Sequence, residues 1–99
     1  MRLTETQKRA ITETVHQELG EDVTIRLFGS RLDDSAKGGD VDLLIESAHP
    51  ISNPAEAAAR VSAKLMRALG GRKVDVLLNA TNLTQLPIHR IAHDQGALL

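Results

Sequence analysis

Residues 40–45 read Asp-Val-Asp-Leu-Leu-Ile, a run in which two carboxylates alternate with an apolar side chain before three aliphatic residues follow. Such alternation and aliphatic content are typical of a β-strand. Because successive side chains of a strand point to opposite faces, Asp40 and Asp42 share one face, with Cα atoms about 6.6 Å apart. The run therefore predicts a strand that brings two carboxylates to one place.

The commonest explanation of aspartates in a strand is a sheet face that lies in water. The neighbouring residues argue against it, because Leu44 continues the face of both carboxylates. A second run, residues 73–78, repeats the pattern, with Asp75 two positions before Leu77. These carboxylates thus lie at the edge of a face that becomes buried, where their desolvation is costly unless another group compensates it.

If the two runs form neighbouring strands, Asp75 joins Asp40 and Asp42. Three carboxylates this close repel one another unless a cation neutralises them. Carboxylate oxygens suit Mg²⁺ or Mn²⁺, which take their remaining ligands from water and from substrate phosphates. The two runs therefore predict a divalent-metal site.

Residues 23–28 alternate in the same way and predict a strand that leads into Gly29-Ser30. A glycine after a strand lets the backbone turn sharply and present N–H groups, and the serine hydroxyl adds a donor, so the pair suits phosphate oxygens. Most such steps are ordinary turns, and this prediction depends on the spacing to the aspartates. Arg31 is a candidate phosphate contact, whereas Lys37 is interpreted as a solvated loop charge.

Capping and breaking residues predict where the helices begin and end. Thr4 and Gln7 form a capping-box pattern before apolar residues at helical spacing, which Gly20 ends, and Asn53-Pro54 suits the start of a second helix. The predicted elements are helix 5–19, strand 23–28, strand 40–45, helix 54–69, strand 73–78, a helix between residues 84 and 96, and a short strand at 97–99. This order predicts an α/β (α+β) fold of two layers, in which helices cover a short mixed sheet.

The length of 99 residues predicts one domain, residues 1–99. The net charge of −1 and a single aromatic residue, Phe28, argue against general nucleic-acid binding, which needs clustered basic residues or aromatic stacking platforms. The chain has no cysteine, no apolar leader and no apolar run of membrane-spanning length. These features exclude disulfides and predict a cytoplasmic protein without membrane association.

Three separated segments resemble the signature of nucleotidyltransferases of the DNA polymerase β superfamily. Gly29-Ser30 is followed after nine residues by Asp40-Val-Asp42, and Asp75 follows on a strand after one predicted helix. The ending, residues 91–99, also resembles the tail of minimal nucleotidyltransferase (MNT) domains. The chain is therefore identified as a member of this family, which implies a nucleotidyltransferase fold.

The resemblance implies that Asp40 and Asp42 bind two Mg²⁺ ions, with Mn²⁺ as the alternative metal. It implies that Asp75 completes one metal site and helps to activate the incoming hydroxyl. It also implies that Gly29-Ser30, with Arg31, holds the phosphates of a nucleoside triphosphate, expected to be ATP. The hydroxyl would attack the α-phosphorus and pyrophosphate would leave, a displacement that two metal ions can stabilise.

Minimal members of this family are often paired with a small helical protein of the HEPN type, frequently an RNA-cleaving toxin. Some of them silence it by transferring AMP to a tyrosine. The resemblance thus implies an antitoxin-like adenylyltransferase that acts on a partner protein. Two alternatives stay open, a scaffold that binds the helical partner without chemistry and an enzyme that adenylylates a small molecule such as an aminoglycoside. The sequence does not distinguish a homo-oligomer from a complex with a partner.

His89 and His93 lie four residues apart in the last predicted helix and could share a metal. No third ligand is apparent near them in the sequence, so they are interpreted as an exposed pair. His93 also suits the helix C-terminus, where a cation interacts favourably with the helix dipole.

Overall fold

The structure is a computed structural model that describes residues 3–28 and 41–99. Its elements are α1 (Glu5–Leu19), β1 (Val23–Phe28), β2 (Val41–Ser47), α2 (Pro54–Ala68), β3 (Val74–Asn79), α3 (Pro87–Gln95) and β4 (Ala97–Leu98). The predicted succession of helices and strands is confirmed, and β2 runs two residues further than expected. No helix within these ranges is long and apolar enough to cross a membrane.

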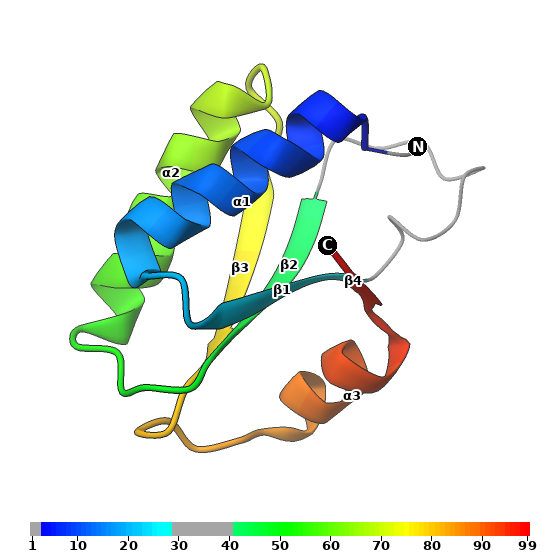
Figure 1. The fold of residues 1–99 in the computed structure, drawn as a ribbon. Helices are drawn as coiled ribbons and strands as arrows, with labels where there is room; N and C mark the ends of the chain where they lie inside the picture. Colours follow the sequence, from blue (N-terminus) through cyan, green and yellow to red (C-terminus); the bar gives the residue numbers. More distant parts are fainter. Residues whose placement is uncertain (1–2, 29–40) are drawn as a thin grey trace.

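The four strands form one mixed sheet in the order β3-β2-β1-β4. β2 runs parallel to β3 and antiparallel to β1, and β4 pairs antiparallel with the other edge of β1. Figure 1 shows α1 and α2 together on one face of this sheet and α3 on the other. The predicted α/β architecture is confirmed, and α3 adds a partial cover on the second face.

The start of α1 is fixed by the predicted capping box. The Gln7 N–H donates to Thr4 Oγ1 at 3.1 Å, and the Thr4 N–H donates to Gln7 Oε1 at 2.8 Å. Gly20, with a φ of 89°, ends the helix in a backbone conformation that favours glycine. Between these ends the helical spacing buries Ile11 and Val15, as predicted.

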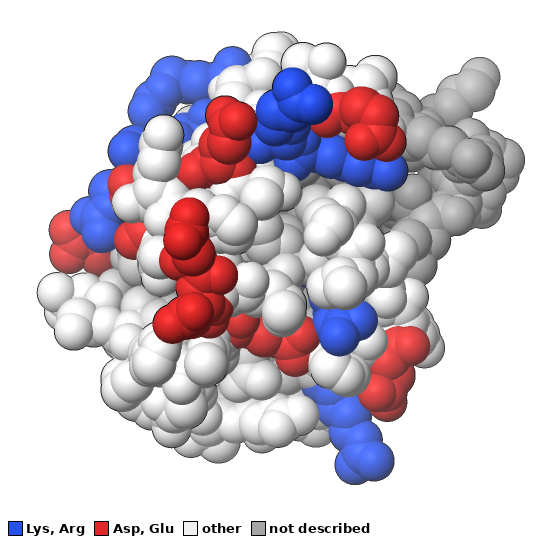
Figure 2. Space-filling view, in the orientation of Figure 1, with Lys and Arg blue, Asp and Glu red and all other residues white. Residues whose placement is uncertain are grey.

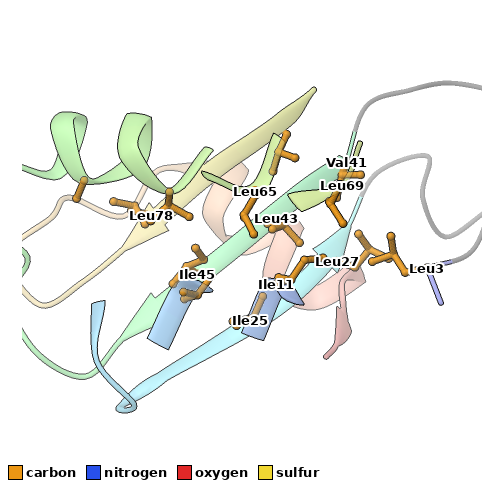
Figure 3. Packing of buried hydrophobic residues seen from close by; sticks show 14 of the residues in the cluster. Leu3, Ile11, Ile25, Leu27, Val41, Leu43, Ile45, Leu65, Leu69 and Leu78 are labelled. Atoms are coloured by element: carbon orange, nitrogen blue, oxygen red, sulfur yellow. The ribbon is translucent and has the colours of Figure 1, made fainter. Parts of the chain in front are cut away.

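The main core lies between the sheet and the layer of α1 and α2 (Figure 3). Val41, Leu43 and Ile45, alternate residues of β2, are fully buried, and so are Val61 and Leu65 of α2. Burying each such side chain stabilises the fold by about 1.5–3 kcal/mol. Because alternate residues of β2 point into this core, the residues between them point to the opposite face, which we call the α3 face.

His89 attaches α3 to the sheet. Its side chain is only 5% exposed, its Nδ1 accepts from the Leu86 N–H at 2.9 Å, and its Nε2 donates to the Leu78 carbonyl at 2.8 Å. The bond at Nδ1 requires a neutral ring with its proton on Nε2. The prediction of an exposed histidine pair is therefore wrong for His89. The ring acts as the cap of its own helix, a role in which sequence patterns normally place Ser, Thr, Asp or Asn.

Replacing His89 with alanine is expected to lower the free energy of unfolding by about 2–3 kcal/mol, because it leaves a buried carbonyl and an N–H without partners. Urea denaturation followed by circular dichroism measures this change. Gln95→Ala, at an exposed position of the same helix, is the control and should change stability by less than about 0.5 kcal/mol. Equal effects of the two substitutions would contradict the anchoring role.

Candidate functional site

The register of the parallel pair β2–β3 places Asp42 directly opposite Asp75. Neighbouring strands lie about 4.8 Å apart, so the two carboxylates are adjacent. Both residues alternate with core residues, Val41 and Leu43 in β2 and Val74 in β3, and both therefore lie on the α3 face. The structure thus joins two of the three predicted aspartates.

The remaining predicted site residues lie outside the described ranges. They are Gly29, Ser30, Arg31, Lys37 and Asp40. β1, the strand that precedes the Gly-Ser step, ends at Phe28, and the register partner of Phe28 is Asp42. The described part of β1 therefore ends in the row that holds both described aspartates, directly before the predicted phosphate-binding residues in the sequence.

The apolar continuation of this face is confirmed. Leu44, two residues after Asp42, is fully buried, and its register partner Leu77 is partly buried. Ala92 of α3 is also fully buried, consistent with α3 packing over this row of the sheet. The α3 face is therefore divided into a half beneath α3 and a half that carries the aspartates.

The two aspartates differ in exposure. The Asp75 side chain is 51% exposed, with Lys73 Nζ at 3.9 Å from its Oδ1, whereas Asp42 is half-buried. An ion pair this long between exposed side chains contributes little, so Lys73 only weakly offsets the repulsion between the carboxylates. A divalent cation would offset it better, because it can take one oxygen from each carboxylate.

The donor chemistry therefore fits Mg²⁺ or Mn²⁺, which bind through one or two carboxylates and complete their shell with water and phosphate oxygens. Within residues 3–28 and 41–99, no group of three or more His, Cys, Asp or Glu side chains gathers into a metal site. Asp42 and Asp75 supply two ligands, and the third predicted ligand, Asp40, is the residue that precedes β2. His93, for which sequence analysis considered a metal-binding role and set it aside, is bonded to Glu46.

Glu46 is the centre of a second polar cluster on the α3 face, which sequence analysis missed. Its Oε1 accepts from Arg26 Nε at 2.9 Å, and its Oε2 lies 2.8 Å from His93 Nδ1. Burial raises the pKa of this carboxyl, but the bonds from Arg26 and His93 outweigh that effect and hold the pKa below its usual range. A surface hollow of about 600 Å³ opens beside the cluster. The paired groups fasten α3 to β1 and β2, and we assign them a structural role.

Comparison with known proteins supports the same fold and family. The family model described as a nucleotidyltransferase domain matches residues 8–96. No match is found among curated proteins.

Three solved structures resemble this chain in fold at low sequence identity. One is a toxin–antitoxin structure with AMP-PNP, at 22% identity and a TM-score of 0.68, covering 92% of this chain and 70% of that one. Another is the tri-AMPylated HEPN toxin of Shewanella oneidensis in complex with an MNT antitoxin, at 22% identity and a TM-score of 0.65, covering 93% and 67%. A third is a MntA–HepT toxin–antitoxin, at 20% identity and a TM-score of 0.64, covering 96% and 70%. At these identities the likeness establishes the fold.

Replacing Glu46 with glutamine tests the cluster through pH. A carboxyl whose pKa is lower in the folded state contributes stability above its unfolded pKa of about 4.5, and the contribution is lost as pH falls through the lower folded pKa. Glu46→Gln should therefore lower stability at pH 7 by about 1–2 kcal/mol and flatten its decline below pH 4.5. Urea denaturation across pH measures both effects. Glu56→Gln, at an exposed pair, is the control, and an unchanged pH profile in Glu46→Gln would contradict the assignment.

Replacing Asp75 with asparagine tests the metal site. Without metal the variant should be as stable as the original or slightly more stable, because repulsion with Asp42 is relieved. With Mg²⁺ and a non-hydrolysable ATP analogue, the original should gain up to about 2.7 kcal/mol at a ligand concentration 100 times its Kd, and the variant should gain far less. Thermal unfolding with and without metal measures this difference. The control variant Asp94→Asn, on α3, should gain as much stability from metal and nucleotide as the unsubstituted chain does. If Asp75→Asn gained as much stability as the unsubstituted chain, Asp75 would be excluded as a metal ligand.

Proposed function

The chain belongs to the nucleotidyltransferase domain family, and on this basis we propose that it transfers AMP from ATP, with Mg²⁺, to a hydroxyl of a HEPN-type partner protein, as the antitoxin of a toxin–antitoxin pair. The observation that carries this proposal is the register match of Asp42 with Asp75 on neighbouring parallel strands. Family membership supports the reaction class, and the register, which makes Asp42 and Asp75 neighbours, supports a shared metal site.

In this proposal, Asp40, Asp42 and Asp75 hold the metal ions, and Gly29-Ser30 with Arg31 holds the β- and γ-phosphates. Bound Mg²⁺ would supply positive charge at the attacking and leaving oxygens of an in-line displacement. Asp75 is half exposed at the β3 edge of the sheet, so it can be reached by a hydroxyl that arrives from outside the chain. Asp42 is half-buried between β1 and β3, which suits a ligand held in a fixed orientation.

The reaction balances without a further reactant. The acceptor oxygen forms a bond to the α-phosphorus, and the bond between that phosphorus and the bridging oxygen of pyrophosphate breaks. Asp75, next to the arriving hydroxyl, helps to take up its proton, which then passes to water. The products are the AMP ester of the acceptor and pyrophosphate.

A separate observation supports the proposal that a partner protein supplies the acceptor hydroxyl. The described residues form one sheet with three helices, and none of them builds a lobe that could enclose an acceptor. In this proposal a partner presents the hydroxyl. Among the similar solved structures, one holds a HEPN toxin that carries AMP in complex with an MNT antitoxin, and another holds AMP-PNP. These structures make a HEPN-type acceptor and an adenine nucleotide the natural candidates.

The test is incubation of the purified chain with its co-expressed HEPN-type partner, Mg²⁺ and ATP labelled at the α-phosphate. Label should reach the partner, and Asp42→Asn or Asp75→Asn should lower the rate about 100-fold or more, because each removes a direct metal ligand. Asp22→Asn, at an exposed loop position, is the matched control and should transfer at the original rate. Neutralisation of a toxic partner without any transfer of label, equally by the original and by Asp75→Asn, would establish a non-catalytic scaffold instead.

A further inference from the structure

Lys73 directly precedes β3 and lies beside the start of β2. The Val41 N–H donates to the Lys73 carbonyl at 2.9 Å, so Lys73 takes part in the pairing of the two parallel strands. Val74 is buried in the core, and alternation therefore places the Lys73 side chain on the α3 face together with Asp75. The starts of β2 and β3 lie at the same end of the sheet (Figure 1). Lys73 thus brings a positive charge to the end of the face that carries both described aspartates.

The ion pair between Lys73 and Asp75 is too long to hold the lysine in place. Nζ lies 3.9 Å from Asp75 Oδ1, beyond hydrogen-bond distance, and the Lys73 side chain is 65% exposed. Arg26, on the same face, differs, because its Nε lies 2.9 Å from Glu46 Oε1 and its side chain is 22% exposed. Arg26 is therefore held in a structural contact, whereas the ammonium group of Lys73 can reorient on its flexible stem.

The acid that faces Lys73 also distinguishes it from other lysines. Figure 2 shows basic and acidic side chains next to one another over the part of the molecule where α1 and α2 lie. In that part, Lys64 Nζ lies 2.9 Å from Glu18 Oε2, and Glu18 has no role in the candidate site. Asp75, in contrast, is a proposed metal ligand. A cation held by Asp75 would use its oxygens and repel the Lys73 ammonium group, which would then need another partner.

Phosphate oxygens are a suitable partner for this ammonium group. Three aspartates and a triphosphate together carry more negative charge than two Mg²⁺ ions neutralise, so a further cation beside the site is favourable. Lysine binds phosphate as a point charge and does so beside metal ions in other phosphoryl-transfer sites. β2 lies between β1 and β3 in the sheet. A phosphate held over the start of β2 is therefore within reach of a side chain at the start of β3.

We propose that Lys73 binds a phosphate oxygen of the nucleoside triphosphate, and that this bond replaces its contact with Asp75. The inference rests on the proposed function, because it adds a residue to the same metal and nucleotide site. A lysine that served only as the counter-ion of Asp75 would compete with metal for the carboxylate and would contribute nothing to nucleotide binding. The two roles therefore predict different nucleotide affinities when the charge of Lys73 is removed.

The test measures metal binding and nucleotide binding separately in Lys73→Gln by isothermal titration calorimetry. The Kd for a non-hydrolysable ATP analogue at saturating Mg²⁺ should rise about 10-fold, because a charge-assisted bond is lost. The Kd for Mn²⁺ alone should stay the same or fall, because a competitor for Asp75 is removed. Lys73→Arg keeps the positive charge and should restore most of the nucleotide binding. Lys8→Gln, which removes a lysine from an exposed ion pair on α1, is the matched control and should bind the analogue as the original chain does.

An unchanged Kd for the analogue in Lys73→Gln would overturn the inference, as would an equal rise in Lys8→Gln. An equal rise in the Kd for Mn²⁺ alone would also overturn it, because the substitution would then act through the metal site. Thermal unfolding without ligand checks that each variant is folded.

The same experiment separates this inference from the proposed function. If the original chain transfers AMP and Lys73→Gln binds the analogue normally, only the inference fails. If nucleotide binding depends on Lys73 but no AMP reaches the partner, the proposed function fails and the inference stands. Absence of nucleotide binding by the original chain would overturn both.

Discussion

The parallel pairing of β2 with β3 is the constraint on which the rest of the structure depends. Its register sets Val41 against Val74 in the core and Asp42 against Asp75 on the α3 face. Because side chains alternate, a shift of β3 by one residue would turn Val74 out of the core and Asp75 into it, away from Asp42. The aliphatic core of β2 therefore fixes the position of the carboxylates, and the energy that holds the candidate site together is mainly hydrophobic.

The α3 face serves two purposes because α3 covers only part of it. Two histidines one helical turn apart fasten this short helix, His89 to the end of β3 and His93 to Glu46 of β2. Leu44 is fully buried. The row of the sheet two residues nearer the start of β2 carries Asp42 and Asp75. The polar groups that fasten α3 and the candidate metal-binding carboxylates thus lie on different parts of one sheet face.

Under the proposed function, this division leaves the carboxylate pair accessible to an acceptor from outside the chain. The carboxylate pair lies at the β3 side of the sheet, where one aspartate is half exposed. Under the proposed function, the carboxylates would hold the metal ions, and the exposed Ile88 and Ile91 have no role in that chemistry.

The sequence by itself determined the order of elements, the capping of α1, and the alternation that puts Asp42 and Leu44 on one face, because these depend on residues close together in the chain. The sequence predicted that Asp75 lies beside Asp42 only on the condition that their two strands pair. Only the tertiary structure decided that register, the burial of His89 and the bonding of Glu46 to Arg26 and His93. Each joins residues distant in sequence, and a histidine or glutamate carries no local signal of whether water or a buried partner will satisfy it.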